Sequence, residues 1–182
     1  KYADLDKNGV INADDQDWVY NPVPKFSYGL NIALNYKNFD LSMFWQGVCD
    51  KDVYNNQKFQ TDFWSVTDAG SNKGNRLLNA WNTNNTGSTI PMLTTSNTAD
   101  EGRASSYFVE NGSYLKLRTL QLGYNVSATF LSKFKMSSAR IYVSGQNLLT
   151  IKSKSLTCPD PENPDWNYPL ATSVSFGLQI GF

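Results

Sequence analysis

The sequence predicts an all-β fold whose antiparallel strands belong to a transmembrane β-barrel with long extracellular loops. Three observations support this: segments that are apolar at every second position, connections that alternate between short and long, and an aromatic content of 14%. No stretch reaches the roughly 18 consecutive apolar residues of a membrane-spanning helix, whereas a spanning strand needs only about 9–11 residues. The sequence therefore excludes a spanning helix and permits spanning strands.

The clearest strands are the first and the last. In residues 26–36 every even position is apolar or aromatic and every odd position is small or polar, so one face of the strand is apolar and the other polar. The last segment, 173–182, alternates in the same way. After a short turn at 37–38 the alternation resumes at 39–46, although Phe44 interrupts the polar row, and this pattern predicts a hairpin.

Two less regular strands are expected at 114–126 and 139–149. In the former, the apolar positions change phase between Leu117 and Leu120, which predicts either a β-bulge or a change of surroundings partway along the strand. In the latter, Ile141 and Val143 alternate with polar residues. Five strands in all cannot close a barrel, because the smallest membrane barrels use about eight and an open edge in lipid leaves backbone groups without hydrogen bonds. The chain is therefore expected to be part of a larger barrel.

The connections indicate an orientation. They are short at 37–38, very long at 49–112, short to medium at 127–138 and long at 150–170, as in outer-membrane barrels with short periplasmic turns and long outer loops. Aromatic residues are expected near both ends of the apolar face, like the girdles at the two membrane interfaces. They are Phe26 and Tyr28 at the outer end, and Tyr36, Phe39, Tyr124 and Phe182 at the inner end.

Charge and rare residues limit the chemistry. The 16 basic and 16 acidic residues give no net field that favours nucleic acid, and the absence of histidine removes histidine-based catalysis and most zinc sites. Cys49 and Cys158 do not form a redox motif, and the sequence leaves open whether they pair. A glycosidase would need paired carboxylates, but acids in loops are usually solvated, so we predict no enzyme. The candidate acids are Asp100, Glu101, Asp160 and Glu162.

Four stretches resemble one protein family. They are NPVPKFSYG at 21–29, ENGSYLKLRTLQLGY at 110–124, VSGQNLL at 143–149 and SFGLQIGF at 175–182, and in this order they closely resemble the C-terminal end of SusC/RagA-type TonB-linked outer-membrane proteins. The resemblance covers almost the whole chain. It implies a large plugged barrel of about 22 strands. From the order of short and long connections, residues 1–23 are expected to form an extracellular loop and 24–182 to supply about five barrel strands.

The resemblance also implies a role and partners. Such a barrel would import oligosaccharides or peptides through the outer membrane together with a SusD-like surface lipoprotein. Energy would come from the TonB complex, which acts on an N-terminal region that this sequence does not include.

The segment 4–15 has the spacing of an EF-hand calcium loop. Gly9 occupies position six, where the loop must turn sharply, and Asp15 replaces the usual glutamate at position twelve. Because aspartate reaches less far, we expect weak binding, in the range of roughly 10⁻⁴–10⁻³ M. The alternative is a turn rich in aspartate and asparagine without metal. The expected ligands are Asp4, Asp6, Asn8, the Val10 carbonyl, Asn12 and Asp15.

Three tryptophans in the long outer loops, Trp64, Trp81 and Trp166, are candidate ligand contacts because flat rings near amide and carboxylate groups suit sugar rings. Loop aromatics also pack against their own loop or a partner, and the sequence does not separate these roles. Two alternatives to a transporter stay open. One is a soluble β-sandwich, and the other a calcium-dependent surface carbohydrate-binding protein without transport.

Overall fold

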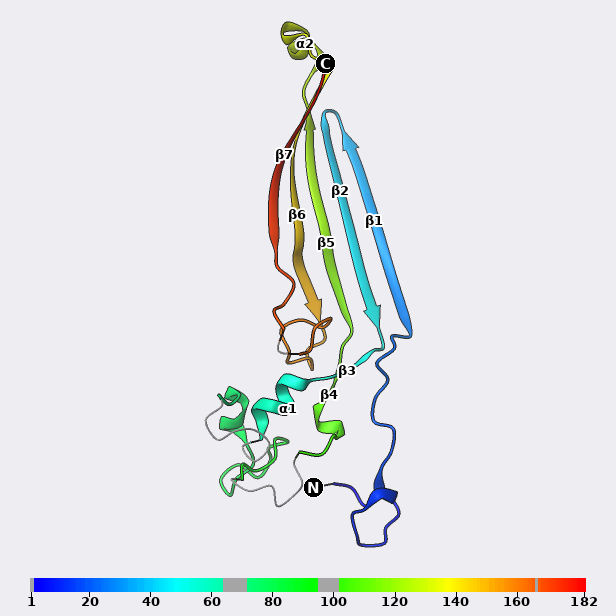
Figure 1. The fold of residues 1–182 in the computed structure, drawn as a ribbon, viewed down its shortest axis with the longest axis vertical. Helices are drawn as coiled ribbons and strands as arrows, with labels where there is room; N and C mark the ends of the chain where they lie inside the picture. Colours follow the sequence, from blue (N-terminus) through cyan, green and yellow to red (C-terminus); the bar gives the residue numbers. More distant parts are fainter. Residues whose placement is uncertain (1, 64–71, 95–101, 166) are drawn as a thin grey trace.

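The computed structural model describes residues 2–63, 72–94, 102–165 and 167–182. Its main element is a five-stranded antiparallel sheet in which each strand pairs with the next in order along the chain. Figure 1 shows the long connections at one end of the sheet and the short ones at the other. The five predicted strands are confirmed. They are β1 (Phe26–Tyr36), β2 (Phe39–Cys49), β5 (Tyr114–Asn125), β6 (Ser138–Lys152) and β7 (Ser173–Gly181).

The phase change predicted in the third strand is a β-bulge at Arg118. Trp45 of β2 pairs with Leu117, and the pairing resumes at Thr119, which leaves Arg118 as the extra residue. Strand β6 is also irregular here, and its Asn147 has a φ of 51°. Because an extra residue resets the alternation, the apolar positions before and after it point to the same face of the sheet.

The short connections lie at the end of the sheet that carries the C-terminus (Figure 1). Strands β1 and β2 are joined by the two residues Lys37 and Asn38. Strands β5 and β6 are joined by a short helix, α2 (Ala128–Leu131), and a 3₁₀ turn, η4 (Ser132–Phe134). This turn ends at Lys135 in the left-handed conformation, with a φ of 54°.

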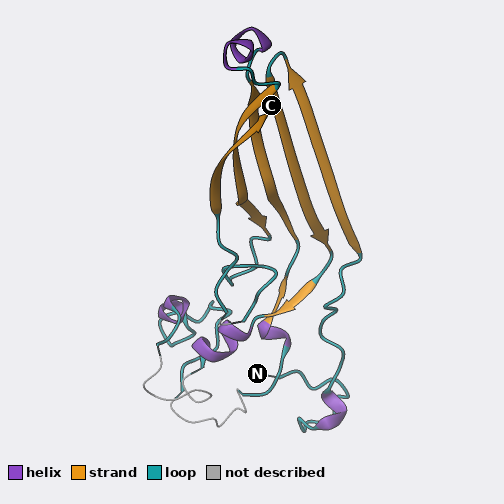
Figure 2. Cartoon of the chain, turned by 45° about the horizontal axis from the view of Figure 1, so that its top comes forward, coloured by secondary structure: helices purple, strands orange, loops and turns teal. Residues whose placement is uncertain are grey.

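The long connections contain structure that sequence periodicity did not reveal. The segment expected as a single loop at 49–112 includes a small two-stranded sheet and several short helices, and Figure 2 shows them grouped beyond the end of the large sheet. Elements of three to seven residues are too short for a periodic pattern. None of the described helices is long and apolar enough to span a membrane. The short elements are η1 (Ala13–Asp15), β3 (Asp52–Tyr54), α1 (Asn56–Asp62), η2 (Asn75–Asn79), η3 (Ser106–Phe108) and β4 (Val109–Asn111).

An aromatic cluster holds β3, α1 and η3 together. Phe108 is 1% exposed, and its ring contacts Tyr54, Phe59, Phe63 and Tyr107 at centroid distances of 5.2–5.7 Å. Such ring pairs add packing energy beyond the area that they bury. The long connection therefore has a core of its own.

Candidate functional site

One face of the large sheet is apolar across all five strands. Among the described residues no second sheet packs on it, because the β3–β4 sheet lies beyond the end of the strands (Figure 1). Phe176 is 85% exposed and Leu178 60% exposed. The alternative of a soluble β-sandwich, which needs a covered face, is therefore not supported. Three rungs cross this face: Tyr36, Phe39, Tyr124, Ile141 and Leu178; Leu34, Leu41, Leu122, Val143 and Phe176; and Ile32, Met43, Leu120, Gly145 and Val174.

The opposite face is polar. Near the short connections, Arg140 of β6 reaches across β5 to Asp40 of β2, with 3.0 Å between Nε and Oδ1. The ring of Tyr142 lies directly over Gly177, so that a Cβ at Gly177 would overlap it. A polar face of this kind lines the interior of membrane barrels, whereas the apolar face meets lipid.

At the other end of the polar face, Lys116 is buried in an ion-pair cluster. Its side chain is 2% exposed, and Nζ lies 2.7 Å from Asp160 Oδ1 and 2.6 Å from Glu162 Oε2. Glu162 also pairs with Arg118 and accepts a hydrogen bond from the Tyr114 hydroxyl at 2.6 Å. Two cations of β5 are thus neutralised by two acids of the β6–β7 loop, and the loop is held against the polar face of the sheet.

The same loop is also tied to the other long connection. Thr157 donates its backbone N–H to Glu110 Oε2 at 2.8 Å, and the buried Asn55 amide donates to both Glu110 and Thr157 at 2.9 and 2.8 Å. Arg76 donates to the Thr157 hydroxyl at 2.8 Å and pairs with the buried Asp62 at 2.6 Å. The β6–β7 loop therefore joins the loop core to the barrel strands.

We expected carboxylates in loops to be solvated, and for Asp160 and Glu162 this expectation is wrong. Both carboxylates form ion pairs that hold the loop against the sheet. Burial alone would raise the pKa of Asp160, but hydrogen bonds from Lys116 and from two backbone N–H groups lower it overall. The pKa of Glu162 is lowered for similar reasons, against the effect of burial. A general acid needs a raised pKa, so this pair does not favour a glycosidase. Asp100 and Glu101 lie outside the described residues.

Sequence reasoning missed Lys116 and Arg118. The available signal was the run LKLR at 115–118, which places two cations on polar positions of an expected barrel strand. Charges removed from water need partners, and Asp160 and Glu162 are two of the three acids in the following long loop.

The acidic loop folds as its spacing suggests. The carboxylates of Asp4, Asp6 and Asp15 offer oxygens that lie within 4.8 Å of one another. Because Ca²⁺ binds oxygens at about 2.3–2.6 Å, two ligands of one ion lie up to roughly 5 Å apart, so these three fit around one ion. Gly9 has a φ of 83°, which a side chain would strain.

Backbone hydrogen bonds shape this loop. Asp4 accepts from the amides of Asn8 and Gly9 at 3.2 and 2.8 Å, and Asn8 Oδ1 accepts from the Val10 amide at 2.7 Å. Asp15 accepts from the amides of Asn12 and Leu5 at 2.9 and 2.7 Å, and these two bonds lower its pKa. Asp15 is therefore held in its ionised form, as a metal ligand must be.

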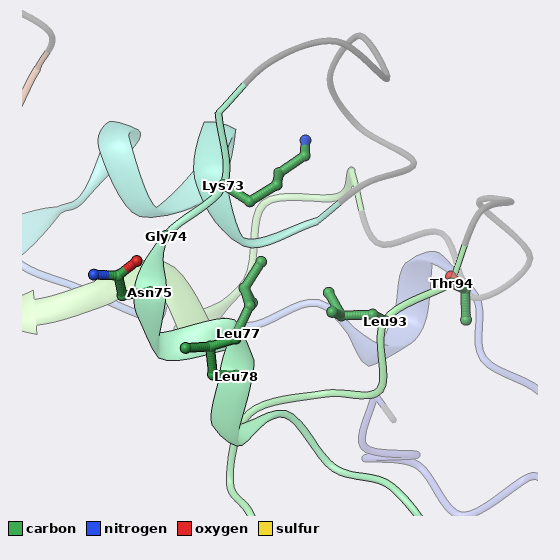
Figure 3. Close-up of a pocket in the computed structure, with 7 residues that line it drawn as sticks. All are labelled: Lys73, Gly74, Asn75, Leu77, Leu78, Leu93 and Thr94. Atoms are coloured by element: carbon green, nitrogen blue, oxygen red, sulfur yellow. The ribbon is translucent and has the colours of Figure 1, made fainter.

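Of the three tryptophans, Trp64 and Trp166 lie outside the described residues. Trp81 is 37% exposed in the long connection. A hollow of about 450 Å³ lies nearby in the sequence, and Figure 3 shows Leu77, Leu78 and Leu93 around it, together with Lys73, Gly74, Asn75 and Thr94. Trp81 is not among the residues that line this hollow, so the structure does not connect the Trp81 ring with it.

Cys49 and Cys158 are both free thiols. Cys49 is exposed at the end of β2, whereas Cys158 is 1% exposed in the β6–β7 loop, where burial raises its pKa. The question that the sequence left open is thereby answered: the two residues do not pair.

Comparison with known proteins agrees with the geometry, although no family model matches the chain. TonB-dependent receptor P3 of Formosa agariphila is 37% identical over 183 residues, which cover 99% of this chain and 17% of that receptor. TonB-dependent receptor SusC of Bacteroides thetaiotaomicron is 30% identical over 190 residues, which cover 100% of this chain and 17% of that receptor. The structure of the RagAB peptide transporter matches with a TM-score of 0.78 and 25% identity, over 95% of this chain and 19% of that chain.

The chain belongs to the SusC/RagA-type TonB-dependent receptors and forms part of their barrel. The resemblance found in the sequence is confirmed. Proteins of this family are located in the outer membrane, so the apolar face lies against outer-membrane lipid and the long connections are extracellular. The chain spans less than a fifth of the SusC and P3 receptors, 17% of each.

Proposed function

We propose that the SusC/RagA-type protein containing this segment imports oligosaccharides or peptides through the outer membrane, without catalysing a reaction. The observation that carries the proposal is a sheet with one uncovered apolar face and one polar face, which suits a wall between lipid and an aqueous interior. The solved structure of the RagAB peptide transporter supports a peptide substrate. We infer a SusD-like surface lipoprotein and the TonB complex as partners, and Trp64, Trp81 and Trp166 as candidate ligand contacts.

The lipid contact is tested by placing charge on the apolar face of the full-length protein. Val174→Arg and Ile32→Arg, which lie in the same rung of the apolar face, each put a cation toward the bilayer interior, at a cost of about 2–4 kcal/mol near the midplane. We expect less folded barrel in the outer membrane, measured by heat-modifiable mobility on gels. Asn31→Arg, next to Ile32 but on the polar face, is the matched control. Normal yields from both apolar-face variants would refute the assignment.

Transport is tested by growth. A strain that lacks the gene is grown on a panel of single polysaccharides and on a protein hydrolysate as sole carbon sources. Complementation with the intact gene should restore growth on at least one of them, whereas a gene without the TonB-contacting segment should not. If the deletion strain grows like the parent on every source, the import proposal fails even where the barrel assembles.

We also propose that the loop 4–15 binds Ca²⁺ through Asp4, Asp6, Asn8, the Val10 carbonyl, Asn12 and Asp15. The cluster of three carboxylates supports this, and the ion would stiffen an extracellular loop next to β1. Calorimetric titration of the intact protein with CaCl₂ should give a dissociation constant of roughly 10⁻⁴–10⁻³ M, and Asp4→Ala should abolish it. An absence of binding heat in the wild type would exclude the site.

A calcium-dependent surface carbohydrate-binding protein without transport is the weaker alternative. Such a protein would need its apolar sheet face covered to be soluble. The uncovered face in the described part of the chain favours the transporter instead.

A further inference from the structure

The connection between β5 and β6 presents an exposed aromatic pair at the periplasmic end of the barrel. Phe130 in α2 and Phe134 in η4 are 52% and 58% exposed, and their ring centroids lie 5.3 Å apart. Leu131, between them, is only 3% exposed. Leu131 is therefore the buried residue of this segment, whereas the rings of Phe130 and Phe134 remain exposed.

This pair continues an interface that is already defined. Helix α2 lies beside the C-terminus, at the end of the sheet where the apolar face finishes (Figure 1). The last rung of that face contains Tyr36, Phe39 and Tyr124, and the terminal Phe182 is 92% exposed. Aromatic side chains at the end of a lipid-facing sheet lie at the level of the lipid headgroups.

The charges next to the pair fit the same environment. Lys133 and Lys135 are both exposed and flank Phe134. No acidic residue occurs between Val126 and Ser137. Aromatic side chains combined with lysines are typical of segments that lie in a membrane interface, with the rings in the acyl boundary and the ammonium groups at the phosphates.

We propose that residues 128–135 form an interfacial anchor that rests on the phospholipids of the periplasmic leaflet, with Phe130 and Phe134 inserted and Lys133 and Lys135 at the headgroup phosphates. The anchor would fix the depth of β5 and β6 in the bilayer. It requires only that the barrel lies in the outer membrane and does not depend on what the protein transports.

Spin labelling of the full-length protein tests this proposal. Single labels are placed by Phe130→Cys, Phe134→Cys and Ser132→Cys in a Cys49→Ser background, and the protein is reconstituted in vesicles of phosphatidylethanolamine and phosphatidylglycerol. Collision rates with oxygen, which concentrates in lipid, and with a water-soluble nickel chelate report the surroundings of each label. Ser132 is two residues from each phenylalanine and so lies on the opposite side of the turn.

We expect the ratio of oxygen to nickel collisions at positions 130 and 134 to be raised several-fold above that at 132, toward the value of a lipid-facing reference label at Phe176→Cys. High nickel accessibility at 130 and 134, equal to that at 132, would overturn the proposal. Low accessibility to both reagents would overturn it as well, because the pair would then be covered by protein.

Discussion

Removal of the buried Lys116 ammonium should release the β6–β7 loop from the polar face of the sheet. In Lys116→Met the apolar stem is retained, but Asp160 loses a partner at 2.7 Å and Glu162 one at 2.6 Å. Breaking one side of a buried ion pair costs about 3–5 kcal/mol. Asp160 keeps two backbone hydrogen bonds and Glu162 keeps Arg118, so we expect the lower end, about 3 kcal/mol.

This free energy predicts a measurable opening of the loop. Since 1.4 kcal/mol is a factor of ten, the opening equilibrium should rise about 100-fold. When opening and closing are fast compared with cleavage, proteolysis follows that equilibrium. The initial rate of tryptic cleavage after the exposed Lys154 should therefore rise by a similar factor, in barrels whose assembly is verified by heat-modifiable mobility.

Two further variants make the comparison specific. Lys25 forms an ion pair with Asp50 on the exposed surface, so Lys25→Met should leave the cleavage rate unchanged. Adding Asp160→Asn to Lys116→Met removes the carboxylate left without its cation and should restore part of the protection. If Lys116→Met is cleaved at the wild-type rate, or if the double variant is cleaved as fast as Lys116→Met, the cluster does not hold the loop.

Three further outcomes follow from the structure. Hydrogen bonds hold the pKa values of Asp160 and Glu162 below the ordinary 3.8 and 4.5, so their contribution to loop docking is complete above pH 4.5 and is lost as the pH falls through the lower folded values. Hydrogen exchange of residues 153–172, corrected for the intrinsic rate, should therefore stay constant above pH 4.5 and rise below it. Gly177→Ala forces a β6 ring aside and should destabilise the barrel by about 1–3 kcal/mol in urea unfolding, whereas Gly87→Ala, which meets no atom within 4 Å, should not. A membrane-permeant maleimide should label Cys49 and leave Cys158 unmodified until the protein is denatured, and equal labelling would contradict the described burial.

The sequence by itself determined the large sheet. Strands of 9–15 residues contain enough alternating positions to reveal their faces, and the bulge at Arg118 was visible as a shift of phase. The lipid environment was also readable, because a face that meets hydrocarbon must be apolar along the whole strand. The same holds for the acidic loop, whose proposed ligands lie within twelve consecutive positions and whose carboxylates are brought together by local turns alone.

Only the tertiary structure decided how the long connections fold. Lys116 and Asp160 lie 44 positions apart, and Asn55 and Thr157 lie 102 positions apart, so no local pattern relates them. Their pairing depends on burial, since a charge or amide removed from water is stabilised only by a partner that the fold brings within hydrogen-bonding distance. That requirement, rather than any motif, places the β6–β7 loop against the inner wall of the barrel.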